Sequence, residues 1–121
     1  MNLKNPCVYY DFYSLFQSPN TEIIVAQHEN KLVGSGYAKI VNTKPYHINQ
    51  TYAYMGFMFI DPKYRGQGII QNIIETLKNW AKTKNVIEAR LMVYNENTGA
   101  IKAYEKSGFK KHMLEMKLHF D

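Results

Sequence analysis

The chain has 121 residues, a length at which a single domain buries roughly two-thirds of its unfolded surface, and we expect one domain over residues 1–121. A hydrophobic content of 45% excludes a disordered chain, and the formal charge of +5 favours anionic partners such as phosphorylated cofactors, nucleic acid or membrane surfaces. With one cysteine, no signal-peptide pattern and no stretch near the ~18 apolar residues of a membrane span, we expect a soluble cytoplasmic protein.

The first predicted element is a helix over Val8–Gln17, in which aromatic residues recur at helical spacing. Residues 22–28 then predict a strand. A tight turn leads into a second strand at 32–41, so that the two strands form a hairpin. After a loop, residues 51–60 predict a third strand that is apolar on both faces and therefore central, with Gly56 marking a bulge.

The clearest helical pattern begins at Ile69. One face of this helix carries an apolar stripe, and the lysines near its C-terminal end suit the helix dipole. The stripe consists of Ile69, Ile70, Ile73, Ile74, Leu77, Trp80 and Ala81.

The last third of the chain predicts a strand, a helix and a strand. The strand covers residues 86–94, and the helix has Asn97 as N-cap and Gly108 just past its end. Residues 112–120 alternate, which predicts a half-buried strand with Leu114, Met116, Leu118 and Phe120 on one face. The whole order predicts an α/β fold of the α+β type, a mixed and mainly antiparallel sheet flanked by helices.

The junction between the third strand and the long helix carries the first chemical pattern. Backbone N–H groups at a helix N-terminus favour an anion, and Gly66 and Gly68 let a ligand approach the backbone closely. Arg65 adds a guanidinium suited to phosphate oxygens. The pattern is neither a Walker A loop nor a dinucleotide fingerprint, since Gln71 stands where the third glycine belongs. A bound phosphate or pyrophosphate and a solvated turn are the two interpretations.

The second pattern lies on the next helix. Asn97, Ala100, Ile101 and Tyr104 share one face, with Asn97 and Tyr104 about 10 Å apart along the axis. The Tyr104 phenol can donate a proton to a thiolate or pack as a core aromatic, and Asn97 can act simply as an N-cap.

Taken together, "RGQGII" after a strand ending "FIDP", followed by "NENTGAIKAYEKSGFKK", resembles the GCN5-related N-acetyltransferase (GNAT) family from about Glu22 onward. The resemblance implies an acetyl-CoA-dependent enzyme that acetylates a primary amine of a small molecule, peptide or protein by direct attack. It also implies a pyrophosphate site formed by backbone amides of Arg65, Gly66, Gln67, Gly68, Ile69 and Ile70.

The same resemblance assigns further roles. The backbone of Met58, Phe59 and Ile60 pairs with the pantetheine arm, which lies between this strand and residues 88–94. Asn97 contacts the cofactor and Lys106 adds charge near its phosphates. Tyr104 acts as general acid on the departing thiolate, and a backbone N–H near Met58 stabilises the oxyanion.

The sequence departs from the family in three places. The central strand has no carboxylate to act as base, which leaves His47, Tyr52 or Tyr54 acting through water as candidates. Ile70 replaces a small residue. The first strand and first helix of the family are expected to be lacking, and the exposed sheet edge that results favours a homodimer.

The histidines show no spacing typical of a metal site, and we expect structural or surface roles for them. Two functions besides the acetyltransferase stay open. One is a CoA-binding module with little or no transfer activity. The other is a basic nucleic-acid-binding domain, against which stands the even spread of Lys and Arg.

Overall fold

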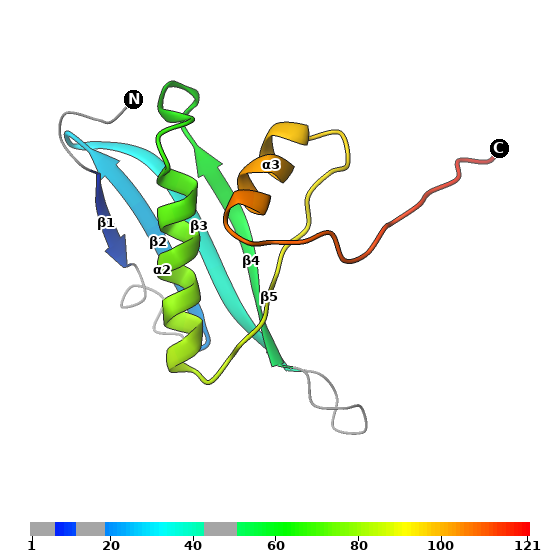
Figure 1. The fold of residues 1–121 in the computed structure, drawn as a ribbon, viewed down its shortest axis with the longest axis horizontal. Coiled ribbons are helices and arrows are strands. Elements are labelled where there is room, and N and C mark those ends of the chain that lie inside the picture. Colours follow the sequence, from blue (N-terminus) through cyan, green and yellow to red (C-terminus); the bar gives the residue numbers. More distant parts are fainter. Residues whose placement is uncertain (1–6, 12–18, 43–50) are drawn as a thin grey trace.

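The computed structural model describes residues 7–11, 19–42 and 51–121, which form a five-stranded sheet with two α-helices on one side (Figure 1). The strands lie side by side in chain order, antiparallel except for the parallel last pair. This arrangement confirms the predicted mixed, mainly antiparallel sheet. The strands are β1 (Val8–Asp11), β2 (Thr21–His28), β3 (Lys31–Asn42), β4 (Thr51–Ile60) and β5 (Ala89–Arg90).

The strand β1 corrects the prediction at the N-terminal end. Val8–Asp11 was predicted to be helical but pairs with β2, Val8 opposite Gln27 and Asp11 opposite Ile24. Pairing with an edge that needs a partner outweighs the local helical spacing. The expected lack of a first strand was therefore wrong, and the rest of the predicted helix lies outside the described residues. Tyr9 ties β1 to the long helix, because its hydroxyl accepts a hydrogen bond from Asn72 Nδ2 at 3.0 Å.

The hairpin β2–β3 and the bulge in β4 confirm the predictions for the middle of the sheet. Glu29 and Asn30 both have positive φ, 49° and 66°, as a tight turn between twisted strands requires. The register between β3 and β4 shifts directly after Gly56. Gly56 also gives room to the Tyr37 ring on β3, since a Cβ there would lie 2.5 Å from Tyr37 Cε1.

The helix α2 (Ile69–Thr83) packs its apolar stripe onto the sheet, as predicted (Figure 1). Its inward side chains meet small and apolar residues of β2, β3 and β4, which together form the core. The most deeply buried helix residues are Ile69, Ile73, Ile74, Leu77 and Ala81. Ile70 and Trp80 flank the core and are partly buried. The shorter helix α3 (Thr98–Lys106) lies beside α2, where Gln71 Nε2 donates to the carbonyl of Ala103 at 3.3 Å.

The C-terminal strands differ from prediction. Residues 86–94 were predicted as one strand, but only Ala89–Arg90 pairs with β4. Residues 109–121 have no regular secondary structure, and Figure 1 shows them running outward from the sheet. The prediction of a final strand at 112–120 was therefore wrong for the single chain. A strand needs a hydrogen-bonding neighbour, and no strand lies beside this segment within the described ranges.

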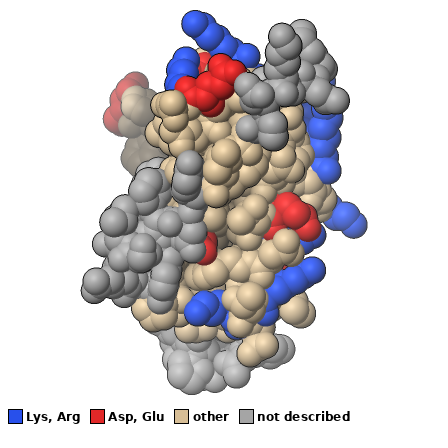
Figure 2. Space-filling model, turned by 90° about the vertical axis from the view of Figure 1, so that its left-hand side faces the viewer, with Lys and Arg blue, Asp and Glu red and all other residues tan. Residues whose placement is uncertain are grey.

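Charged side chains on the surface seen from the β1 side lie mostly toward the rim, around an uncharged middle (Figure 2). Basic and acidic groups are interspersed there, so the described residues on this side form no continuous basic stripe. Among the described residues, no helix has the length and apolar character needed to cross a membrane.

Candidate active site

The loop between β4 and α2 is fixed at its start by Asp61. The Asp61 carboxylate accepts a hydrogen bond from the backbone N–H of Lys63 at 3.0 Å and forms an ion pair with Lys31 at 3.2 Å. The Lys63 hydrogen bond, and then the Lys31 ammonium, lower the pKa of Asp61, so the group stays ionised at neutral pH. This cap starts the short 3₁₀ turn η1 (Pro62–Tyr64).

The end of η1 is anchored to β2 by an aromatic pair. Tyr64 Oη lies 3.1 Å from Nδ1 of His28, and the two rings meet edge to face with centroids 5.3 Å apart. His28 is buried, which fits the structural role expected for it. Tyr64 was not predicted, because its partner is 36 residues away and nothing in the local sequence signals the contact. The turn η1 is thus held at both of its ends, and the glycine segment follows it.

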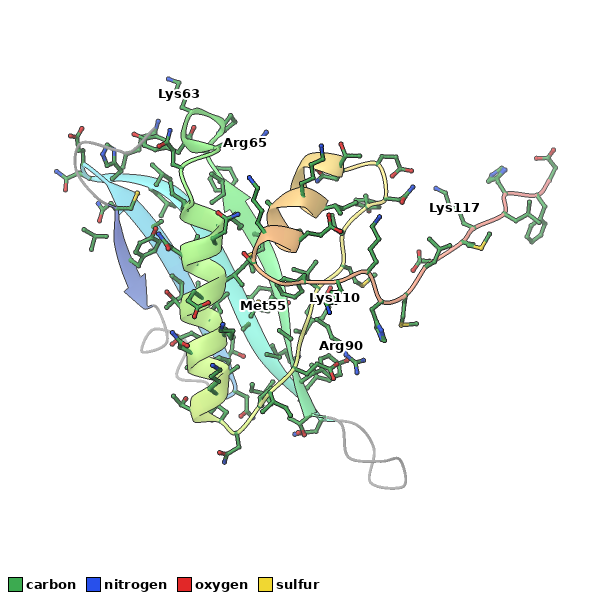
Figure 3. The ribbon with its side chains drawn as sticks, in the orientation of Figure 1. Met55, Lys63, Arg65, Arg90, Lys110 and Lys117 are labelled. Atoms are coloured by element: carbon green, nitrogen blue, oxygen red, sulfur yellow. The ribbon has the colours of Figure 1, made fainter. Side chains whose placement is uncertain are left out.

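The glycine segment presents backbone donors rather than side chains. Gly66 and Gly68 have φ of 80° and 79°, and a Cβ at either would meet no atom within 4 Å. Gly68 is the N-cap of α2, no side chain caps the helix, and its first turn contains no acidic residue. The first intrahelical bond runs from Asn72 N–H to Gly68 C=O, and the N–H groups of residues 66–71 donate to no backbone acceptor among the described residues, so an anion can bind them. Lys63 and Arg65 extend from the same loop (Figure 3).

The strand β4 has a free edge beside this loop. β5 pairs with β4 only at Ala53 and Tyr54, so residues 55–60 have no strand partner on that side within the described chain. At the bulge, two β4 residues, Phe57 and Met58, stand opposite the single residue Gly36 of β3. The backbone beyond the bulge is therefore available to an extended ligand.

The predicted pantetheine-binding residues occupy this free edge. The Met58 and Ile60 side chains pack against the core on the α2 side, whereas Phe59 is half exposed. Their backbones, rather than their side chains, thus face the opening between β4 and β5. This is the mode of contact that the sequence resemblance implies.

The helix α3 holds Tyr104 in a defined position near its C-terminal end. The N–H of Phe109 bonds to the carbonyl of Tyr104 at 3.1 Å, and the N–H of Gly108 bonds to that of Glu105 at 3.0 Å. Gly108 has φ of 101°, so this ending is a Schellman motif, as the predicted glycine position indicates. The motif brings Phe109 edge to face with the Tyr104 ring, centroids 6.1 Å apart. Burial raises the pKa of the Tyr104 phenol, so the group stays protonated at neutral pH.

Asn97 caps α3, as its position predicts. Its side-chain oxygen accepts a hydrogen bond from the N–H of Ala100 at 3.2 Å. Lys106 lies exposed in the last turn of the same helix, and no described contact brings it to the Arg65 loop. The link between α3 and the first turn of α2 is instead Gln71, which sequence reasoning treated only as a missing glycine.

The structure does not identify a base. β4 carries no carboxylate, and the Tyr52 ring is covered by the Arg90 guanidinium at 4.1 Å. Tyr54 is half buried on the same strand, and His47 lies outside the described residues. Within the part of the chain that is described, no three His, Cys, Asp or Glu residues gather in a way that could hold a metal ion.

Several solved structures share this fold. A mutant of the BH1408 protein from Bacillus halodurans gives a TM-score of 0.80 at 24% identity, over 90% of this chain and 71% of that one. Glucosamine-6-phosphate N-acetyltransferase from Arabidopsis thaliana gives a TM-score of 0.70 at 21% identity, over 88% of this chain and 71% of that one. A predicted acetyltransferase with acetyl-CoA from Clostridium acetobutylicum gives a TM-score of 0.71 at 21% identity, over 89% of this chain and 70% of that one. At these identities the likeness establishes the fold alone.

No curated protein sequence matches the chain. The family model described as the acetyltransferase (GNAT) family matches residues 2–109, which is most of the chain and includes the Arg65 loop, Asn97 and Tyr104. The chain therefore belongs to the acetyltransferase (GNAT) family.

Proposed function

We propose that the protein transfers the acetyl group of acetyl-CoA to a primary amine of a small molecule, a peptide or a protein. The observation that carries this proposal is the uncapped, glycine-lined N-terminus of α2 at the end of a strand whose edge is free. An anionic group and an extended arm joined to it fit these two features together. The acetyl-CoA bound by the related Clostridium acetobutylicum protein has both parts.

The residues present fit acetyl-CoA on structural grounds. Open space above Gly66 and Gly68 admits a pyrophosphate to the backbone N–H groups from Gly66 to Ile70. The Arg65 N–H already donates to the carbonyl of Pro62 at 3.4 Å, so Arg65 would contribute the positive charge of its guanidinium instead. The backbone of residues 58–60 would hold the pantetheine arm. The amide nitrogen of Asn97, whose oxygen caps α3, would contact the cofactor. When bound, acetyl-CoA supplies a thioester with an acetyl group that an amine can attack.

The chain's own groups suit the two ends of the transfer. A backbone N–H at the β4 bulge, near Met58, would stabilise negative charge on the acetyl oxygen. Tyr104 would donate its phenolic proton to the thiolate sulfur as the C–S bond breaks, and its raised pKa keeps that proton in place at neutral pH. The acceptor must arrive as a neutral amine, because a protonated amine has no lone pair for attack.

The first test is calorimetric titration of acetyl-CoA into the whole chain and into an Arg65→Glu, Gly68→Asp variant. We expect saturable micromolar binding by the native chain and a loss of at least a hundredfold in the variant, because both changes place negative charge against the pyrophosphate. An Arg65→Gln, Gly68→Ala variant serves as control, since it alters the same positions without adding charge. Absence of binding by a folded native chain would refute the proposal.

A CoA-binding module with little transfer activity is the second candidate, and the absence of a carboxylate on β4 favours it. Tyr104→Phe separates the two candidates. For a transferase we expect turnover with an amine to fall about 10²-fold to 10⁴-fold while acetyl-CoA affinity stays within twofold. For a binding module, native and variant chains would show the same negligible turnover.

We also propose a cytoplasmic location, which the single thiol of Cys7 fits.

A further inference from the structure

The glycine segment (residues 66–68) depends on its two ends for its shape. Its N–H groups donate to no backbone acceptor among the described residues, and two of its three residues are glycines with positive φ. Glycine has the widest backbone freedom of all residues. The placement of the N–H groups that an anion would meet is therefore set by whatever holds the residues before and after the segment.

The two ends of the glycine segment are held in different ways. After the segment, Ile69 is 3% exposed and packs in the core as the first residue of α2. Before the segment, the backbone N–H of Asp61 donates to the carbonyl of Val33 on β3 at 2.8 Å, and Tyr64 Oη lies 3.1 Å from Nδ1 of His28 on β2. The hydrophobic core thus fixes one end, and the hairpin β2–β3 fixes the other.

The side chains that reach this loop from the hairpin belong to one cross-strand pair. His28 and Lys31 stand opposite each other beside the turn between β2 and β3, and we call them the hairpin pair. His28 meets Tyr64, while Lys31 forms an ion pair with Asp61 at 3.2 Å and places its ammonium 5.8 Å from the centroid of the Tyr64 ring. Figure 1 shows the β2–β3 turn and the β4–α2 loop at the same end of the sheet.

The burial of His28 indicates more than a packing role. The residue is 9% exposed, and its Nε2 atom is buried without a hydrogen-bond partner among the described residues. A buried polar atom without a partner costs free energy, so an apolar side chain would serve stability better at this position. What the imidazole offers that an apolar side chain cannot is the hydrogen bond from Nδ1 to Tyr64.

We propose that the hairpin pair positions the acetyl-CoA loop, with His28 acting through Tyr64 and Lys31 acting through Asp61. Together they hold the backbone N–H groups of residues 66–70 in place before the cofactor binds. The inference rests on the proposed function and adds two positioning residues to it. Donors that are already in place bind more tightly, because less conformational entropy is lost on binding. The hairpin pair should therefore set the affinity for acetyl-CoA.

Asp61 separates positioning from simple charge attraction. By charge alone, removing a carboxylate from a loop that receives an anion should tighten binding. Asp61→Asn keeps an oxygen for the N–H of Lys63 but loses the ion pair with Lys31. We expect calorimetric titration to show an acetyl-CoA affinity that is lower by about 3-fold to 10-fold, despite the lost negative charge. Equal or tighter binding by the folded variant would overturn the role of Lys31.

Tyr64→Phe tests the other half of the hairpin pair. It removes only the hydroxyl that meets His28 and keeps the ring, and we expect acetyl-CoA affinity to fall about 3-fold to 10-fold. Tyr9→Phe is the matched control, because it removes a hydroxyl that bonds to Asn72 at 3.0 Å, outside the loop. Its affinity should stay within about 1.5-fold of native.

His28 itself is tested by two amide variants. The amide of His28→Asn reaches the place of Nδ1 and can keep the bond to Tyr64, whereas that of His28→Gln reaches the place of Nε2. We expect His28→Asn to bind acetyl-CoA within about twofold of native and His28→Gln to bind as weakly as Tyr64→Phe. Because the two residues act as a unit, His28→Gln with Tyr64→Phe should cost no more than either change alone. Equal affinities of the two amide variants, or additive losses in the double variant, would overturn the role of His28.

The native chain separates this inference from the proposed function. Circular dichroism at the titration temperature first establishes that each variant is folded, so that affinities are compared between folded chains. If the native chain binds acetyl-CoA and Tyr64→Phe binds it equally well, the hairpin pair does not position the loop, and the proposed function stands. A folded native chain that does not bind acetyl-CoA would refute both.

Discussion

The helix α2 and the C-terminal tail carry equally regular apolar patterns, yet only α2 buries its pattern within the single chain. Leu77 of α2 is fully buried, whereas Leu118 of the tail is 83% exposed. The difference follows from how each element satisfies its backbone. A helix closes its hydrogen bonds internally and needs only an apolar face to pack against, but a strand needs a neighbouring strand as well.

The comparison extends to what each region offers a ligand. The start of α2 is rigidly placed, because Asp61 and Tyr64 fix the preceding loop and Gln71 joins the helix to α3. The β5 edge, in contrast, is a strand of two residues followed by irregular backbone. The candidate site therefore lies between a helix start that tertiary contacts fix and a strand edge with little regular structure of its own.

The largest expected effect tests the difference in burial. Leu77→Ala removes a fully buried side chain between α2 and the sheet, and we expect it to lower the free energy of unfolding by about 2–5 kcal/mol. Chemical denaturation followed by circular dichroism measures this loss. The loss should be nearly the same at every protein concentration, because the side chain lies inside one chain.

Leu118→Ala is the matched control in the tail. The same truncation removes a side chain that is already exposed, so little apolar contact is lost. The free energy of unfolding in dilute solution should stay within about 0.5 kcal/mol of native. A cost for Leu118→Ala that equals that of Leu77→Ala when dilute would contradict the distinction between the two regions.

Sequence patterns predicted the elements that the chain completes by itself. The hairpin turn at Glu29–Asn30, the bulge after Gly56 and the apolar stripe of α2 each depend on neighbours in sequence or on a periodic face. The glycine ending of α3 belongs to the same class, because Gly108 and Phe109 act on the residues just before them.

The wrong predictions concern segments whose structure depends on pairing with another strand. Val8–Asp11 became β1 because the edge of β2 pairs with it, a contact that helical spacing cannot reveal. Residues 86–94 and 112–120 have strand patterns, but a pattern does not say which strand, or which chain, supplies the hydrogen bonds. Among the candidate site residues, Arg65–Ile70 and Tyr104 were predicted from motifs. The contact between His28 and Tyr64 joins residues that are distant in sequence, so no local motif could predict it.

An intermediate effect is expected at Asn97, for which the sequence left two roles open. Asn97→Ala removes the cap of α3, and we expect a loss of about 1 kcal/mol in the free energy of unfolding. Asn97→Ser should keep the cap, because its hydroxyl oxygen can accept the same hydrogen bond from Ala100, and it loses the amide donor without adding charge. Weaker acetyl-CoA binding by a fully stable Asn97→Ser variant would assign Asn97 to the cofactor. Unchanged binding would leave it as a cap only.

The smallest expected effect concerns the pH dependence of stability through Tyr104. Burial raises the pKa of its phenol, so between the ordinary value near 10 and the raised value the folded chain holds a proton that the unfolded chain has released. The stabilisation is complete below about pH 10 and is lost as the pH rises through the folded pKa. Tyr104→Phe should therefore lose less stability than the native chain between pH 9 and pH 11 in denaturation series.

Tyr9 has a pKa raised by burial as well, so Tyr9→Phe should reproduce part of this alkaline change but none of the loss of turnover. Stability profiles that coincide for the native and Tyr104→Phe chains would mean that Tyr104 is as well solvated when folded as when unfolded, and would remove the argument that burial keeps its proton in place for transfer.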